Sequence, residues 1–183
     1  MSQETDLTRV KVTGAVNYPH LFKPKAFGSG APKYSLTVSF AKNETEIYNS
    51  VRMAMSAAVQ EGIDRGLFKA GEENSENFQS PLYDGDAAKS GSDRYPGQWY
   101  MRARNTYPPS AIVGPDRQPL TDEKSINRGD VCNVVVILYP YNYEGKCGVG
   151  CRLIGVQKTE DPEAYADSHQ VQYTAEELFE VLV

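Results

Sequence analysis

Aromatic and cationic side chains alternate with apolar ones in several stretches of this chain. In QWYMRARN, residues 98–105, Tyr100, Arg102 and Arg104 share one face of a predicted strand, while Trp99 lies on the opposite face, in the predicted core. Aromatic rings stack on unpaired bases and guanidinium groups bind phosphates, so this face has the chemistry of a single-stranded nucleic-acid binder. For any one strand, the other interpretation is a solvated sheet face whose arginines pair with nearby carboxylates.

The same mixture of residue types recurs on other predicted strands. Tyr139, Tyr141 and Tyr143 follow one another at period two and run into a predicted hairpin turn, and Gly148 and Gly150 alternate with apolar residues on the next strand. Positions without a side chain would let a nucleotide approach the backbone there. We therefore expect phosphates to be bound by Lys11, Lys33, Arg102, Arg104, Lys146 and Arg152, and bases to stack on some of Tyr100, Tyr107, Tyr139 and Tyr141.

Charge is distributed unevenly along the chain. The 183 residues include 19 Lys and Arg against 24 Asp and Glu, and the resulting net charge of −5 argues, taken alone, against a polybasic nucleic-acid binder. No Lys or Arg follows Lys158, whereas seven acids do, so residues 1–158 hold 19 basic and 17 acidic side chains, a balance of +2. The sequence therefore predicts a mildly basic body, residues 1–158, and an acidic tail, residues 159–183.

The predicted tail ends in the segment TAEELFEVLV. An acidic tail can compete with nucleic acid for the protein's own groove, or it can recruit partner proteins. A docked C-terminal helix is an equally good interpretation, because Thr174 and Glu177 form a capping-box pattern. A short helix that is recognised by a partner protein would be consistent with both the acidic-tail and the docked-helix interpretation. The candidate partner-binding residues are Glu176, Glu177, Phe179 and Glu180.

Apolar periodicity predicts the elements that must position these side chains. Helical spacing predicts one long helix from Asn43 to Arg65, with a capping-box pattern of Asn43 and Glu46 at its start and Gly66 at its end. The segments 17–33 and 69–97 are predicted loops. Five or so strands and a single helix fit a small closed barrel better than a parallel sheet, which would need several helices. Strands are predicted over residues 7–16, 33–40, 98–105, 111–113, 131–141 and 147–157.

Other residue types that could do chemistry form no recognised catalytic motif. Cys147 and Cys151 share the apolar face of one predicted strand, which favours core cysteines over a zinc site completed by Cys132. Asp84 and Asp86 in YDGD could bind a divalent cation, but a solvated turn is the more usual explanation. We expect no metal, no cofactor and no enzymatic activity; a small metal-dependent enzyme that uses the YDGD loop is an alternative.

Cellular location follows from what the sequence lacks. Three cysteines do not suggest a disulfide framework, no N-terminal apolar stretch resembles a signal peptide, and no apolar run is long enough to cross a bilayer. These observations predict a reduced, cytoplasmic protein without a membrane segment.

Several blocks of the chain resemble a family of phage and prophage single-stranded-DNA-binding proteins. The resemblance covers most of residues 9–158, and the late hairpin carries its most specific part. The blocks, in chain order, are VNYPHLFKPK, KYSLTVSFAK, PLYDGD, QWYMRARN followed by two prolines, and VVVILYPYNYEGKCGVGCRLIGVQK.

The resemblance implies a fold and a function. The expected fold is mainly β, an OB-like five-stranded barrel with one long α-helix, a long polar mid-chain loop and an acidic C-terminal tail. The expected function is sequence-independent binding of single-stranded DNA in phage replication and recombination, in the host cytoplasm, without catalysis. Tails in related proteins usually end in an aromatic residue, whereas Phe179 is followed by four more residues here.

Two questions remain open at this point. A structural phage protein, such as a tail or capsid-associated component, would also explain a β-rich chain without DNA affinity. The sequence leaves open the choice between DNA and RNA and the oligomeric state, a homo-oligomer included.

Overall fold

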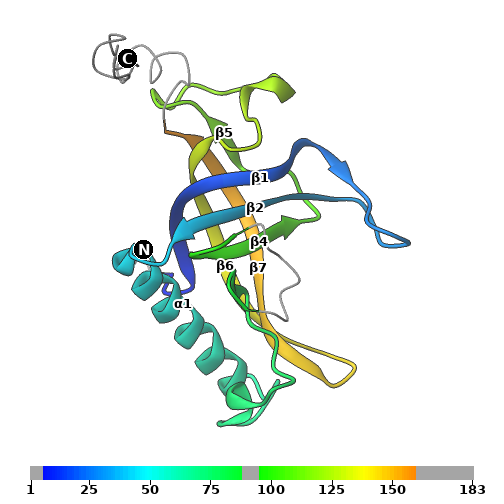
Figure 1. The fold of residues 1–183 in the computed structure, drawn as a ribbon. Helices are drawn as coiled ribbons and strands as arrows, with labels where there is room; N and C mark the ends of the chain where they lie inside the picture. Colours follow the sequence, from blue (N-terminus) through cyan, green and yellow to red (C-terminus); the bar gives the residue numbers. More distant parts are fainter. Residues whose placement is uncertain (1–5, 88–94, 160–183) are drawn as a thin grey trace, which may run out of the picture.

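The computed structural model describes residues 6–87 and 95–159 of the chain. Its elements follow one another around a barrel, with a single long helix after the second strand (Figure 1). Their bounds are β1 Arg9–Lys25, β2 Lys33–Ala41, α1 Thr45–Asp64, the 3₁₀ turn η1 Glu72–Asn74, β3 Leu82–Asp84, β4 Gln98–Asn105, β5 Ala111–Val113, the 3₁₀ turn η3 Glu123–Ser125, β6 Val131–Tyr143 and β7 Lys146–Lys158.

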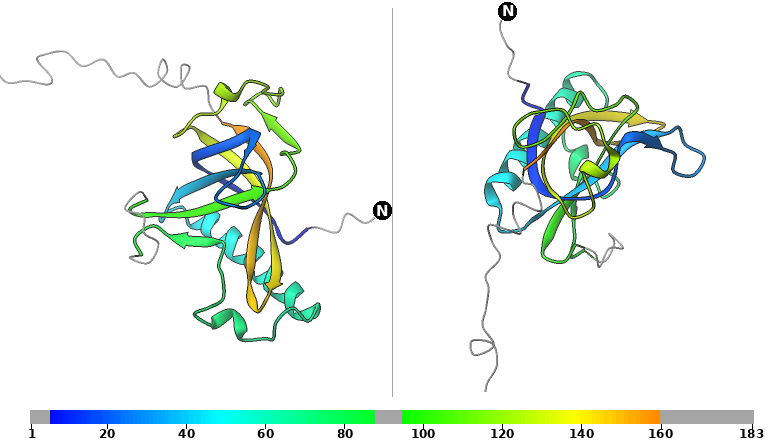
Figure 2. Two further views of the ribbon diagram at one scale, coloured as in Figure 1. Left: turned by 90° about the vertical axis from the view of Figure 1, so that its right-hand side faces the viewer. Right: turned by 90° about the horizontal axis from the view of Figure 1, so that it is seen from above.

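The sheet closes on itself through a contact that is remote in sequence. The hydrogen-bonded order is β3-β4-β2-β1-β6-β7-β5, and an additional parallel pairing joins β4 to β7 at Arg104 and Arg152. This pairing makes a closed ring of β1, β2, β4, β7 and β6, with the short strands β3 and β5 outside it (Figures 1 and 2). The predicted OB-like barrel of five strands with one long helix is thereby confirmed.

Strict alternation along the strands fills the interior of the barrel. In β6, Cys132, Val134, Val136 and Leu138 are all buried, whereas the residues between them are at least partly exposed. Successive side chains of a strand point to opposite faces, so one face of β6 forms the core. Helix α1 covers the barrel at β6 and β1 and places Val51, Ala54 and Ala58 against it.

Two predicted element boundaries were wrong. Strand β1 continues through the predicted loop as far as Lys25, and this extension pairs with β2 to form a ribbon that projects from the barrel (Figure 1). Register shifts before and after His20 accommodate the prolines of this segment, since proline is tolerated at bulges. Helix α1 begins at Thr45 and its N-cap is Glu44, without a side-chain cap hydrogen bond, so the predicted capping box does not form.

The predicted mid-chain loop, residues 69–97, is more structured than its composition suggests. It contains η1 and β3, and Gln79 forms an isolated bridge with Gly148 of β7. The Gln79 N–H donates to the Cys147 carbonyl at 3.0 Å, and the Val149 N–H donates to the Gln79 carbonyl at 2.9 Å. This segment therefore packs along β7 before it reaches β3. Residues 88–94 lie outside the described ranges.

The β6–β7 hairpin is tighter than predicted and extends beyond the barrel in the same direction as α1 (Figure 2). Its connection is the two residues Glu144 and Gly145, both with positive φ (49° and 83°). Two-residue turns of this kind match the twist of antiparallel strands. Both strands are therefore longer than predicted, and the predicted tyrosines of β6 lie within a regular hairpin.

The three cysteines differ in accessibility. Cys132 and Cys151 are buried in the core, and burial raises the pKa of each thiol to about 12. Cys147 is only partly buried. Within residues 6–87 and 95–159, no three side chains of His, Cys, Asp or Glu gather as a metal site, and no helix is long and apolar enough to span a membrane.

We expect only Cys147 to react rapidly with a thiol-specific reagent in the folded protein. The thiolate is the reactive form, and the two buried thiols stay protonated and shielded at neutral pH. A chromogenic disulfide reagent should titrate one fast thiol in the native protein and three after denaturation. Cys147→Ser should abolish the fast phase, and a fast phase that survives this substitution would contradict the assignment.

Candidate nucleic-acid interface

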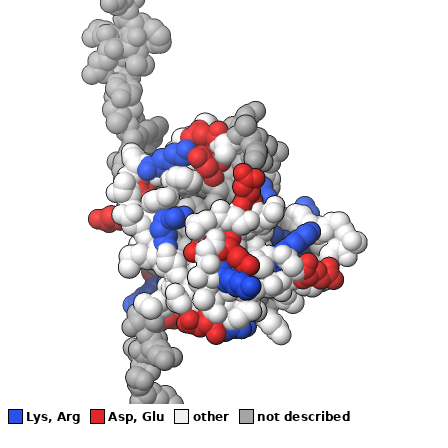
Figure 3. Space-filling model, turned by 90° about the horizontal axis from the view of Figure 1, so that it is seen from below, with Lys and Arg blue, Asp and Glu red and all other residues white. Residues whose placement is uncertain are grey.

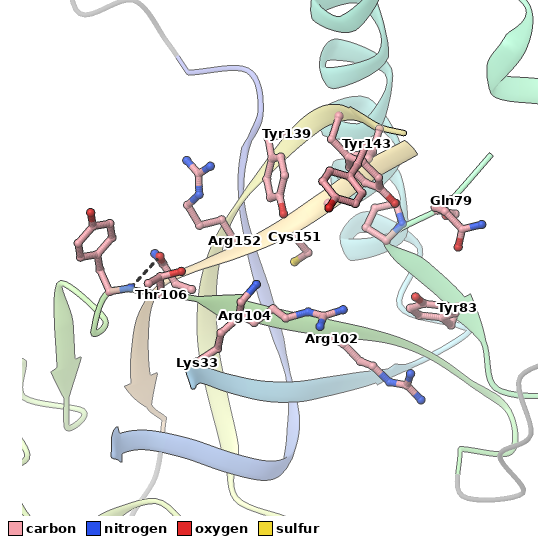
Figure 4. Close-up of a pocket in the computed structure, with 17 residues that line it drawn as sticks. Lys33, Gln79, Tyr83, Arg102, Arg104, Thr106, Tyr139, Tyr143, Cys151 and Arg152 are labelled. Carbon is pink, nitrogen blue, oxygen red and sulfur yellow. Dashed lines mark hydrogen bonds between the residues drawn. The ribbon is translucent and has the colours of Figure 1, made fainter. Parts of the chain in front are cut away.

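A groove with a volume of about 880 Å³ lies where β4 and β7 meet. Figure 4 shows labelled arginines and tyrosines from several strands arranged around this hollow. Among the described residues that line it there is no Asp or Glu. The lining includes four cations, Lys33, Arg102, Arg104 and Arg152, and five aromatic residues, Tyr83, Tyr107, Tyr139, Tyr141 and Tyr143.

The arginines are positioned by the alternation of β4 and by the closure of the barrel. Met101 and Ala103 point into the core, so Arg102 and Arg104 point outward and are exposed. Arg104 is the direct partner of Arg152 across the parallel β4–β7 pairing. Like charges placed opposite each other on a sheet are destabilising.

No carboxylate of residues 6–87 or 95–159 forms an ion pair with these four cations. Among the described residues, the ion pairs are formed by other cations, so Lys33, Arg102, Arg104 and Arg152 remain available to an anionic ligand. The alternative was that the arginines pair with local carboxylates. The described residues show no such ion pair. The surface seen from below differs, because acidic and basic side chains are intermixed on it (Figure 3).

Neighbouring residues fill the space beside Gly148 and Gly150 of β7. Tyr139 lies opposite Gly150 and Tyr141 lies opposite Gly148. A Cβ on Gly150 would overlap the Tyr139 ring, and a Cβ on Gly148 would lie 2.9 Å from the Tyr141 hydroxyl. The expectation that these glycines admit a nucleotide to the backbone is therefore corrected: Gly150 lets the Tyr139 ring pack onto β7, and Gly148 lets both Gln79 and the Tyr141 hydroxyl approach β7. The Arg152 guanidinium lies 4.8 Å from the Tyr139 ring centroid.

The prediction that Tyr100 stacks on bases was wrong. Its side chain points to the predicted face of β4, but only 1% of it is exposed. Its ring stacks on Tyr83 at 5.1 Å and on Tyr95 at 4.6 Å, between ring centroids. Because β3 pairs with this end of β4, Tyr83 takes the place in the groove that Tyr100 was expected to hold, and Arg102 lies 5.4 Å from the Tyr83 centroid.

The other predicted residues divide by their position around the barrel. Lys11 is exposed on β1 opposite Val135 of β6, and Lys146 is exposed at the tip of the β6–β7 hairpin; neither lines the groove. The structure brings together in the groove the predicted residues Lys33, Arg102, Arg104, Tyr107, Tyr139, Tyr141 and Arg152.

The expected stacking residues did not include two tyrosines that line the groove. Tyr143 was recognised in the period-two series with Tyr139 and Tyr141, but it was not selected as a stacking residue because it runs into the hairpin turn. Tyr83 stands in the YDGD segment, which was considered only for its acids. Burial, followed by the neighbouring Tyr139 and Tyr83 hydroxyls, raises the pKa of Tyr141, which therefore stays neutral at physiological pH.

The acids of YDGD are bound to a lysine. Lys42 Nζ lies 2.6 Å from Asp84 Oδ1 and 2.7 Å from Asp86 Oδ2. An ammonium group held between the two carboxylates occupies the position in which a divalent cation was considered. In this structure the two carboxylates are therefore paired with an ammonium group.

Comparison with known proteins places the chain in a family. The family model described as "Enterobacter phage Enc34, ssDNA-binding protein" matches residues 8–181. The chain belongs to this family. Membership does not favour the alternative of a structural phage protein. No curated protein matches the sequence.

Solved structures agree with the Enc34 family assignment at the level of the fold. The single-stranded DNA-binding protein from bacteriophage Enc34 in complex with ssDNA is 22% identical, with a TM-score of 0.70 over 84% of this chain and 87% of that chain. A second structure of the Enc34 protein, also 22% identical, has a TM-score of 0.67 over 84% and 82%. The bacteriophage T7 single-stranded DNA-binding protein gp2.5 is 17% identical, with a TM-score of 0.52 over 90% and 98%.

The family match extends to residue 181, and thus into the predicted tail. However, residues 160–183, with the candidate partner-binding residues Glu176, Glu177, Phe179 and Glu180, lie outside the described residues.

Proposed function

We propose that this protein binds single-stranded DNA without sequence preference in the groove over β4 and β7. The observation that carries this proposal is the groove itself, in which the described residues include four cations without an ion-pair partner among them, five tyrosines and no carboxylate. It belongs to a barrel whose family is named for single-stranded-DNA binding. The protein acts in the replication and recombination of a phage or prophage genome, in the cytoplasm of the bacterial host.

The mechanism follows from the mixture of side chains. Arg104 and Arg152 bind phosphates with charge-assisted hydrogen bonds, while bases stack on tyrosine rings at roughly 1–3 kcal/mol per base. Stacking uses the face of a base, which all four bases present, so binding tolerates any sequence. A base inside a duplex has both faces covered by its neighbours, and the groove therefore selects single strands.

We further infer that the protein binds DNA without altering it chemically. His, Asp and Glu, which act most often as general acids and bases, are not among the described residues that line the groove. The Cys151 thiol lines the groove but has its pKa raised to about 12 by burial, which leaves it unreactive as a nucleophile.

A salt titration tests the proposed function. The anisotropy of a fluorescent oligo-dT should rise on addition of the protein, and affinity should fall steeply with salt, because neutralised phosphates release counterions. Four groove cations that each neutralise one phosphate would give a logarithmic salt slope of about −3, at about −0.7 per contact. Absence of binding at low salt would overturn the proposal. RNA and duplex competitors in the same assay measure the preference for single-stranded DNA.

Deleting residues 159–183 should tighten DNA binding. The tail carries seven acids and no Lys or Arg, and it competes for the cationic groove in the intact protein. We expect a larger gain in affinity at low salt than at high salt, since screening weakens the tail's attraction to the groove. Oligo-dT titrations of the full-length and truncated proteins check this. Equal or weaker binding by the truncated protein would contradict the competition model and leave partner recruitment as the tail's function.

A further inference from the structure

The YDGD segment is organised around Lys42. Lys42 directly follows β2, and its ammonium bridges Asp84 and Asp86 at 2.6 and 2.7 Å. The same ammonium lies 5.0 Å from the centroid of the Trp99 ring, near the start of β4. We call Lys42, Asp84 and Asp86 the Lys42 clamp. The clamp ties together the end of β2, the end of β3 and the start of β4.

Backbone contacts fix the same turn. The Gly85 N–H donates to the Gln98 carbonyl at 2.9 Å, and the Gly97 N–H donates to Asp86 Oδ1 at 2.9 Å. A Cβ on Gly85 would overlap the carbonyl oxygen of Tyr95, so only glycine permits this close approach. These contacts hold the turn in a shape in which both carboxylates reach Lys42.

Tyr83 lies on the other side of the short strand that the clamp holds. Tyr83 precedes Asp84, and successive side chains of a strand point to opposite faces, so the clamp and the groove use opposite faces of β3. The Tyr83 ring stacks on Tyr100 with an interplanar angle of 16° and lines the groove. Strand β3 has three residues and stands at the edge of the sheet, so it needs support besides its own ladder.

The charges of the clamp reinforce one another. Hydrogen bonds from Lys42 lower the pKa of Asp84 and of Asp86, and the hydrogen bonds to the two carboxylates raise the pKa of Lys42. All three groups are therefore ionised at neutral pH. None of the three lines the groove, so the clamp lies behind the binding surface.

We propose that Lys42 is a positioning residue for DNA binding, which holds Tyr83 in the groove through Asp84 and Asp86 without contacting the DNA itself. This inference rests on the proposed function, and it gives the YDGD segment a structural reason to carry two acids beside an aromatic residue. Loss of the clamp frees β3 to move, and Tyr83 then presents its ring to a base for a smaller fraction of the time.

A double-mutant cycle tests the proposal. The affinity of oligo-dT is measured for the intact protein, Lys42→Met, Tyr83→Ala and the double variant. We expect Tyr83→Ala to lower affinity by about tenfold, as the loss of one stacking ring does, and Lys42→Met to lower it by a smaller factor. In the Tyr83→Ala background, Lys42→Met should have no further effect, because its action passes through Tyr83.

Each other outcome has a definite meaning. Equal losses from Lys42→Met in both backgrounds, with a shallower salt slope, would show that Lys42 binds phosphate directly and would overturn the proposal. No loss from Lys42→Met, or none from Tyr83→Ala, would overturn it as well. These failures are distinguishable from a failure of the proposed function, in which the intact protein itself does not bind.

Two further variants separate positioning from general destabilisation. Lys42→Arg keeps the positive charge and should restore most of the affinity, whereas Lys124→Met, which removes an exposed lysine outside the groove, should leave affinity unchanged. Asp86→Asn removes one ionic contact without shortening a side chain and provides the same cycle if Lys42→Met folds poorly. Thermal melting and near-ultraviolet circular dichroism of the tyrosines monitor folding in each variant.

Discussion

Replacing Arg104 and Arg152 together by glutamine should weaken oligo-dT binding by about a hundredfold or more. Hydrogen bonds to charged groups contribute about 1.5–3 kcal/mol each, and about 1.4 kcal/mol corresponds to a factor of ten. The logarithmic salt slope should become shallower by about 1.4, because two phosphate contacts are lost. Anisotropy titrations at several salt concentrations measure both effects.

The same double variant should be at least as heat-stable as the intact protein. The two guanidinium groups sit on directly paired residues and have no ion-pair partner among the described residues, so their removal relieves repulsion. The matched control is Arg9→Gln with Lys11→Gln, which removes two exposed charges from β1, outside the groove. If this control weakens binding as much as the groove variant does, net charge rather than the groove governs affinity.

Replacing Tyr107 and Tyr143 together by alanine should weaken binding by about thirtyfold or more. The side chains are 75% and 68% exposed, so their removal leaves the core intact. Each lost stacking contact has a cost of about 1–3 kcal/mol. Fluorescence or anisotropy titration with oligo-dT measures the loss, and the melting temperature should stay within a few degrees of that of the intact protein.

Phenylalanine substitutions distinguish stacking from hydrogen bonding at these two positions. Tyr107→Phe with Tyr143→Phe keeps both ring faces, and we expect it to retain most of the affinity. Tyr18→Ala is the matched control, because Tyr18 is 40% exposed on the projecting ribbon and does not line the groove. An equal loss in the phenylalanine variant would show that the hydroxyls, and not the rings, bind the DNA.

The alternation of residue types predicted much of the barrel and one face of the site. The burial of Met101 and Ala103 follows from the period-two pattern of β4, and the same pattern places Arg102 and Arg104 outside. The helix between β2 and β4 was found from its spacing, with an error of two residues at its start. Local patterns suffice here because they determine which side of an element faces the core.

Periodicity does not determine where a residue lies around a closed barrel. Lys11 points outward as predicted, but barrel closure places it away from the groove. Arg104 and Arg152 are paired although they are 48 positions apart in the sequence. Local sequence patterns do not predict a pairing between such distant residues. Likewise, Tyr100 occupies the predicted face but is covered by β3, whose three residues were hidden in a polar segment. These errors concern contacts between remote segments.

Photocrosslinking tests most directly the claim that the groove is the DNA-binding site. An oligo-dT in which single thymines are replaced by 5-iodouracil should crosslink, on irradiation, to aromatic residues that stack on its bases. Mass spectrometry should locate the crosslinks at the groove tyrosines, Tyr83, Tyr107, Tyr139, Tyr141 and Tyr143. Crosslinks confined to tyrosines outside the groove, such as Tyr18 on the ribbon or Tyr48 on α1, would contradict the account.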